Sequence, residues 1–339
     1  MIFGIGGRKL FTHIRPQALR KRLRDALPKS VRLKSRSIRQ HLIEVSRFVS
    51  TLGATVITSI VPTRFDKIIT EHILEFYCKL KPKRIARGAE KKISLLSSGI
   101  AEQYKSQAHQ ISIDYYRMRI EIRWQQPRAI GLRPSVPETE LTGFEHVEKA
   151  LDKGCGAILW RMSFTSAAPV NAALAASGQP LVHLSSTYHL ASTQSWFSAN
   201  VVGRLLCVDE LRFLKKRVIS EQGKTTGYLD QLRDTLNNNE LVSIVGDVSR
   251  GRIQTSVVSG GSTIRVPSGA TSLARSTGAA LLPCAAVRVG AFKYQVIIFP
   301  DVAPDVSLDK RAFRKLAIER YASDREVVLN DHIASYAYF

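Results

Sequence analysis

Apolar positions along the chain change their spacing near residue 138. Between about residues 38 and 130, apolar residues recur every three or four positions, as at Ile69, Ile73 and Phe76, which is typical of helices. Residues that break helices divide this stretch at Pro62, Pro82 and Gly88. The pattern therefore predicts several helices in succession and no sheet in this part of the chain.

Beyond residue 138, short apolar runs alternate with longer amphipathic segments. The predicted strands are Gly156 to Met162, Leu181 to Leu184, Leu241 to Val245, Ala280 to Arg288 and Tyr294 to Phe299. The predicted helices are Ala167 to Ser177, Asp209 to Gln222, Thr226 to Asn237, Ser268 to Thr277 and Asp309 to about Asp331. This alternation indicates an α/β fold with a largely parallel central sheet covered by helices.

Three regions follow from these patterns. Residues 1–37 form a basic amino-terminal arm, residues 38–137 a helical region, and residues 138–339 the α/β domain. The proline-rich stretch from Pro127 to Pro137 is the expected hinge between the last two regions.

The formal net charge of +22 requires an acidic partner or an acidic surface. Basic residues crowd the amino terminus and only Asp25 opposes them; they are Arg8, Lys9, Arg15, Arg20, Lys21, Arg22, Arg24, Lys29, Arg32, Lys34, Arg36 and, just after the arm, Arg39. Nucleic acid, anionic lipid headgroups and a solvated basic tail are the three interpretations. Apolar residues at helical spacing follow directly, including Leu42, Val45 and Val49, and this order favours a membrane surface.

Some classes of protein are disfavoured by the sequence. Four cysteines, Cys78, Cys155, Cys207 and Cys284, lie far apart without a CxxC pair, which argues against a zinc site or a disulfide framework. The longest uncharged apolar stretch, Thr51 to Pro62, is shorter than the ~20 residues that span a bilayer. The amino terminus lacks the charge order of a signal peptide. We therefore expect a protein that is neither secreted nor membrane-spanning.

Four segments, in this order, resemble the bacterial lipid A late acyltransferases of the lysophospholipid acyltransferase superfamily. They are Leu141 to Leu159, Asn238 to Arg252, Val258 to Gly269, and Leu273 to Pro283 followed by Val287 and Arg288. The first segment resembles the part of the family's sequence that leads into its first core strand. The second resembles a strand followed by an acidic turn. The third resembles a glycine-containing loop, and the fourth resembles a helix followed by a strand.

The resemblance implies that the chain transfers a fatty acyl group to a hydroxyl or amine of a lipid or glycolipid. The donor would be a thioester of acyl carrier protein or coenzyme A, and no further cofactor is implied. The enzyme would work at the cytoplasmic face of the inner membrane as a peripheral protein. Such chemistry needs a base, donors to an oxyanion and an apolar groove for the acyl chain.

The sequence departs from the family at its base. The family has a histidine after the first core strand and an acidic residue beyond it, but this chain has Ser163 and Ala168 there. A serine hydroxyl is not a general base near neutral pH. An HxxxxD does occur from His109 to Asp114, but it lies in the helical region, so we interpret it as coincidence.

Two other residues are the predicted catalytic pair. His189 comes shortly after a predicted strand, and loops at the carboxyl ends of strands carry the chemistry of α/β sheets. Asp247 is the predicted orienting carboxylate, with Asp209 and Glu210 as alternatives, although Asp209 also suits a helix start. His183 falls inside a predicted strand, where a packed histidine is the favoured interpretation.

The predicted substrate-binding residues surround the glycine-containing loop. Arg250, Arg252 and Arg265 are candidates for binding a phosphate or carrier group, with solvated arginines as the alternative. The backbone amides of Gly260, Gly261 and Gly269 are candidate oxyanion donors, with turn glycines as the alternative. Ser163 completes the predicted substrate-binding set.

Three functions remain open from the sequence. The first is a divergent acyltransferase whose base has moved, and the second is a catalytically silent relative that binds acyl lipid or acyl carrier. Nucleic-acid binding is third, because it rests on net charge without a recognised motif.

Overall fold

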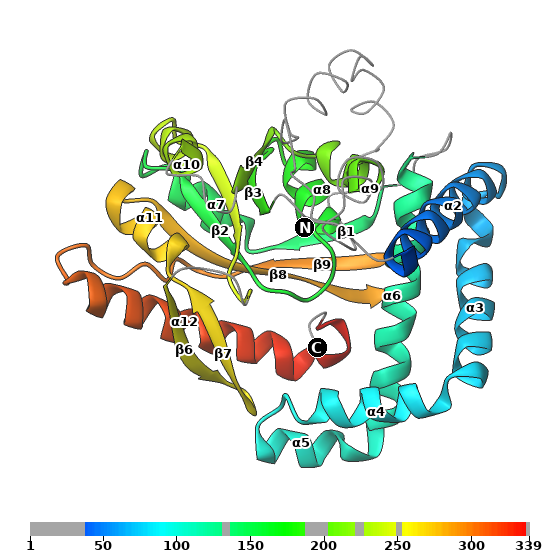
Figure 1. The fold of residues 1–339 in the computed structure, drawn as a ribbon. Coiled ribbons are helices and arrows are strands. Elements are labelled where there is room, and N and C mark those ends of the chain that lie inside the picture. Colours follow the sequence, from blue (N-terminus) through cyan, green and yellow to red (C-terminus); the bar gives the residue numbers. More distant parts are fainter. Residues whose placement is uncertain (1–37, 131–135, 187–202, 221–226, 249–252, 337–339) are drawn as a thin grey trace.

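The computed structural model describes residues 38–130, 136–186, 203–220, 227–248 and 253–336. Figure 1 shows a helical region that flanks an α/β domain built on a central sheet. Both the predicted helical region and the predicted α/β class are confirmed.

The central sheet has seven strands in the order β1-β9-β8-β2-β5-β3-β4. Their bounds are β1 (Glu138–Thr142), β2 (Ala157–Arg161), β3 (Val182–Ser186), β4 (Lys216–Ser220), β5 (Leu241–Val245), β8 (Ala280–Gly290) and β9 (Lys293–Ile298). Neighbouring strands are parallel throughout, except that β9 runs antiparallel to β8. The predicted largely parallel sheet is therefore correct, with one antiparallel pair near its edge.

Helices cover both faces of this sheet. One face packs against α7 (Phe144–Leu151), α8 (Ala168–Ala176) and α9 (Gly203–Leu211); the other packs against α10 (Gly227–Asn237), α11 (Gly269–Thr277) and α12 (Lys310–Asp331). Strand β2 is buried on both sides, because Ile158 and Trp160 point to the second helix layer while Ala157 and Leu159 point to the first. An uninterrupted apolar run is what a central parallel strand requires.

Two segments differ from the sequence prediction. The expected helix from Asp209 to Gln222 is wrong, because α9 ends at Leu211 and β4 follows it. Two basic residues, Lys216 and Arg217, begin β4 and hide its alternation, although Arg217 is buried and donates to the Ser185 hydroxyl at 2.8 Å. Asp209 lies inside α9, so its expected place at a helix start is also wrong.

The glycine-containing loop is a β-hairpin. Strands β6 (Gln254–Ser259) and β7 (Ser262–Pro267) pair antiparallel and form a second sheet of two strands. Gly260 has φ +64°, which a tight turn requires and which other residues rarely adopt. Figure 1 shows the hairpin beside α12.

The helical region contains α2 (Ile38–Ile60), α3 (Asp66–Leu80), α4 (Pro82–Ile93), α5 (Ser98–Tyr104) and α6 (Ala108–Ile130). Helix α6 joins this region to the sheet through buried Glu121, whose two oxygens each accept from Arg288 at 2.8 Å. Buried Lys92 of α4 donates to the backbone oxygen of Tyr336, close to the described carboxyl-terminal end. These polar contacts fix the helical region to the edge of the domain.

Within the described residues, length and composition qualify no single helix as a membrane span. One pair, Phe48–Ile60 and Thr63–Leu80, meets those criteria together, but it bends by 113° between its halves.

Candidate active site

The candidate site lies where two central strands end. Strands β2 and β5 are adjacent and parallel, and Arg161 is paired in register with Val245. Two residues further along each chain segment come Ser163 and Asp247. Parallel strands end at one edge of a sheet, so this register brings the two side chains together.

Ser163 and Asp247 are bonded to each other twice. The Ser163 hydroxyl donates to Asp247 Oδ1 at 2.5 Å, and the Ser163 amide donates to Asp247 Oδ2 at 3.1 Å. Both residues are buried. The predicted site residues Ser163 and Asp247 therefore form one cluster.

Asp247 also faces a buried arginine from α12. Arg325 Nε lies 3.6 Å from Asp247 Oδ2. Both side chains are buried, with 0% of the Arg325 side chain and 1% of the Asp247 side chain exposed. Arg325 also donates through Nη1 to the Ser259 hydroxyl at 2.8 Å, and its guanidinium lies 4.7 Å from the Tyr336 ring centroid. The charge of Asp247 is thus balanced inside the domain, which a buried carboxylate requires.

Gly246 allows the chain beside this cluster to pack closely against two aromatic rings. Gly246 donates its amide to Arg161 O at 2.8 Å, and Tyr321 donates its hydroxyl to the same oxygen at 3.1 Å. A Cβ at Gly246 would lie 2.6 Å from both Trp160 Nε1 and the Tyr321 hydroxyl. Trp160 and Tyr321 stack with centroids 4.3 Å apart. No side chain fits at position 246 without moving both rings.

Arg161 is a second buried cation at this edge. It is 6% exposed, and its Nε and Nη1 atoms have no hydrogen-bond partner among the described residues. Burial lowers the pKa of this guanidinium, and the negative charges of Glu210 and Asp247 oppose that effect. Burial also raises the pKa of the neighbouring Cys284 thiol to about 12, so this cysteine is not a nucleophile.

The three histidines singled out in the sequence have different outcomes. His189, the predicted base, lies outside the described residues, so its role stays a prediction. His183 is 2% exposed and its Nδ1 lies 3.2 Å from the Ser243 hydroxyl, which confirms the packed strand histidine. His109 is exposed on α6, while Asp114 bonds to Arg117, so these two do not form a pair.

The glycines at the hairpin tip have a packing role. Gly261 donates its amide to Leu95 O at 2.9 Å, so this amide does not serve an oxyanion and that expectation is corrected. A Cβ at Gly260 would lie 2.4 Å from the same oxygen. The tip thus packs on the connection between α4 and α5. Gly269 begins α11.

Of the three predicted arginines, the structure describes Arg265, which is not part of the cluster. Arg265 is exposed on β7, opposite Ser256 in the hairpin register. Arg250 and Arg252 lie outside the described residues, so their predicted role stays untested. The position of the expected acidic residue, Ala168, is buried at the start of α8 and offers only a methyl group.

Sequence reasoning missed Arg161, Tyr321 and Arg325. A charged residue directly after a buried apolar run was a usable signal for Arg161, because burying an arginine is costly without a reason. Tyr321 and Arg325 sit in a helix with many charged residues, and nothing local separates them from its solvated positions. Among the described residues, no cluster of three or more His, Cys, Asp or Glu is arranged to hold a metal ion.

Comparison with known proteins supports the resemblance. A search of curated proteins found no match. A sequence model of the bacterial lipid A biosynthesis acyltransferases matches residues 116–313, which include all seven strands of the central sheet and the Ser163–Asp247 cluster. This match extends over more than half of the chain. The chain therefore belongs to the family of bacterial lipid A biosynthesis acyltransferases.

Proposed function

We propose that the protein moves a fatty acyl chain from a thioester to a hydroxyl or amine of a lipid or glycolipid, using a base outside the family's usual position. One observation carries this proposal: β2, β5 and β3 are adjacent parallel strands that end at the same edge. His189 follows Ser186, the last residue of β3, by only three positions. It is therefore the proposed base.

The proposed roles of the cluster follow from its bonds. We assign Ser163 a positioning role, because its buried hydroxyl donates a hydrogen bond to Asp247 and a serine hydroxyl is not a general base near neutral pH. Asp247 acts as a positioning residue that fixes the backbone after β2 and adds negative charge at the edge. Its ion pair with Arg325 keeps that charge in place as the acceptor approaches.

The proposed location of the protein is the membrane surface. Apolar side chains on α2 and α3 are exposed, including Val56 at 59%, Ile60 at 71% and Phe76 at 65%. Exposed apolar residues gathered on one part of a molecule indicate a lipid or protein contact. Together with the basic residues before α2, they support peripheral binding to an anionic surface, which we place at the cytoplasmic face of the inner membrane.

A second candidate function has its own support. Where the family's histidine is expected, Ser163 and Asp247 are bonded to each other and Asp247 faces Arg325 at 3.6 Å, so this position offers no histidine base. A protein of this kind that kept the acyl groove without the base would bind acyl lipid or acyl carrier for a partner. Binding without turnover is the property that separates it from the enzyme.

The deciding experiment measures acyl transfer by the purified full chain. Long-chain acyl carrier protein and acyl coenzyme A are offered separately as donors, with a bacterial lipid extract as acceptor. Acyl binding is measured in parallel by retention of labelled fatty acyl thioester. Transfer supports the enzyme; binding without transfer to any acceptor lipid supports the silent protein.

A further inference from the structure

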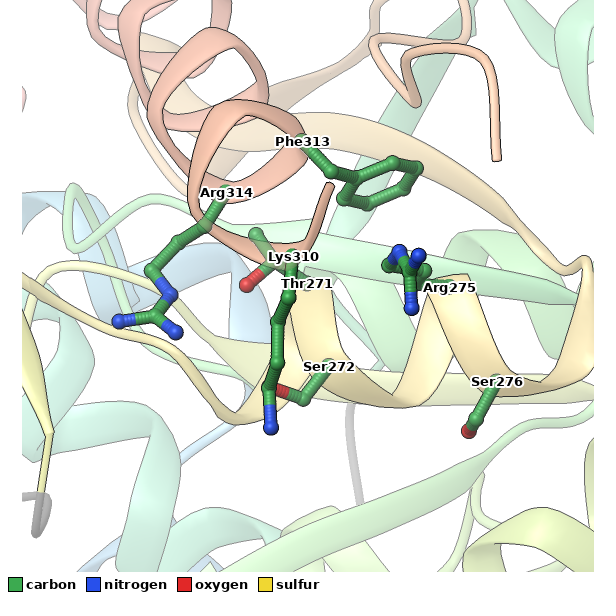
Figure 2. A pocket seen from close by; sticks show the side chains of 7 residues that line it. All are labelled: Thr271, Ser272, Arg275, Ser276, Lys310, Phe313 and Arg314. Atoms are coloured by element: carbon green, nitrogen blue, oxygen red, sulfur yellow. The ribbon is translucent and has the colours of Figure 1, made fainter. Parts of the chain in front are cut away.

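A basic pocket lies between α11 and the first turns of α12, away from the candidate active site. It has a volume of about 150 Å³ and lies over Phe313, whose ring is buried in the core. Figure 2 shows side chains from both helices around it, including Arg275, Lys310 and Arg314. Three cations thus line one small hollow.

Two of these three cations lack an acidic partner among the described residues, whereas the charge of Arg275 acts on Asp309. Lys310 and Arg314 make no ion pair or side-chain hydrogen bond within the described parts of the chain, and Arg314 Nε is buried without an acceptor. A guanidinium nitrogen without an acceptor in the protein is free to donate to an oxygen of a bound anion. Arg275 is held in place because Nε and Nη2 both donate to Leu308 O, at 3.3 and 3.0 Å.

The hydroxyls of the pocket add one further donor. Thr271 donates to the backbone oxygen of Ser268, just before α11, and Ser276 donates to that of Leu273, so both hydroxyl protons are in use. Ser272 lines the same pocket and, in the described structure, its hydroxyl has no partner. One carboxylate lies nearby: Asp309 caps α12 by accepting from the Arg311 and Ala312 amides, which offsets its charge.

We propose that this pocket binds a phosphate group, either as inorganic phosphate or as the monoester headgroup of a lipid. A phosphate dianion presents several acceptor oxygens, and two guanidinium groups, an ammonium and a hydroxyl match them. The pocket is small enough to favour a single phosphate over a bulky anion.

The pocket is separate from the candidate active site. Arg314 and Arg325 are eleven residues apart on α12, which places the pocket about 16 Å along the helix from the Asp247 ion pair. The inference therefore does not depend on the proposed acyl transfer and stands if the protein is catalytically silent.

The test is titration calorimetry of the full chain with inorganic phosphate at constant ionic strength. The double variant Lys310→Gln with Arg314→Gln removes two cations from the pocket. The matched control, Arg311→Gln with Lys315→Gln, removes two exposed cations from the same turns of α12. Equal loss of charge in both variants cancels the contribution of the basic arm.

We expect phosphate binding at least about tenfold weaker in the pocket variant and unchanged in the control. Flotation with vesicles that contain phosphatidic acid is the second arm. Pocket-dependent binding to these vesicles without binding of free phosphate assigns the site to a lipid headgroup. Equal binding by the two variants in both arms, or no phosphate binding in either arm by folded wild type, overturns the proposal.

Discussion

The hydroxyl of Ser163 donates to Asp247 at 2.5 Å across the ends of two neighbouring strands. Ser163 stands at the position where the resemblance leads us to expect the family's histidine. The hydrogen bond joins the loop after β2 to the turn after β5, and Arg325 completes the charge balance from α12. The site is thus held by a serine, a carboxylate and an arginine that come from three separate parts of the chain.

The buried ion pair gives the first prediction. Arg325→Met leaves the Asp247 carboxylate buried without its cation, which costs about 3 to 5 kcal/mol of unfolding free energy. Adding Asp247→Asn to that variant removes the unpaired charge and should restore part of the loss. Chemical denaturation of the two single variants and the double variant measures the coupling. Additive losses would show that the two residues do not interact.

The second prediction concerns Gly246. Gly246→Ala places a methyl group 2.6 Å from Trp160 Nε1 and the Tyr321 hydroxyl, so we expect a loss of about 2 to 3 kcal/mol. Gly227→Ala is the control, because it is also a glycine in the α/β domain and nothing lies within 4 Å of its added carbon. Thermal melts of both variants make the comparison. Similar melting temperatures for the two would contradict the packing described.

Asp324 supplies a prediction about pH. Burial raises the pKa of this carboxyl to about 6, and its buried Oδ2 has no hydrogen-bond partner among the residues that the structure describes. A pKa above the unfolded value means that the stabilising contribution exists at low pH and is lost as pH rises through 6. At pH 7.5 the buried charge is a cost, so Asp324→Asn should stabilise the fold by about 1 kcal/mol.

Melting curves of wild type and Asp324→Asn at pH 7.5 and 4.5 test this sign. The gain should be clear at the higher pH and shrink at the lower one, where the folded wild type carries the proton. A gain of the same size at both values would mean that titration of Asp324 is not its cause.

The exposed apolar residues of α2 predict membrane binding. Val56→Asp with Ile60→Asp puts two charges where lipid contact is proposed, so the fraction bound to anionic vesicles should fall at least about threefold. The control pair is Val258→Asp with Val327→Asp, which are exposed apolar residues of the α/β domain. Vesicle flotation at moderate salt measures both, and equal losses would contradict a role specific to α2.

The elements with the strongest periodicity could be predicted from the sequence. Most of strand β2 is a continuous apolar run, from Ala157 to Trp160, so its buried place in a parallel sheet follows directly. Strand β4 was mistaken for a helix because Arg217, a core residue bonded to Ser185, has the appearance of a surface charge. Tertiary partners decided that segment, and they are not visible locally.

The candidate site could be predicted only in part. Ser163 follows a clear strand and Asp247 follows another, so parallel pairing was enough to place both at one edge. Arg325 comes from a helix about 80 residues beyond Asp247, and its burial depends on how α12 packs. Gly261 was expected to donate to substrate, but the hairpin that turns its amide toward Leu95 depends on contacts with the helical region.

The most direct test of a relocated base is to measure acyl transfer with each thioester donor. Wild type, His189→Ala and Ser163→Ala are compared side by side. We predict transfer by wild type, transfer retained by Ser163→Ala, and transfer lost by His189→Ala although acyl binding persists. This result would establish a relocated base in a member of the family. Acyl binding without transfer by wild type, with either donor, would contradict it and identify a silent acyl-binding protein.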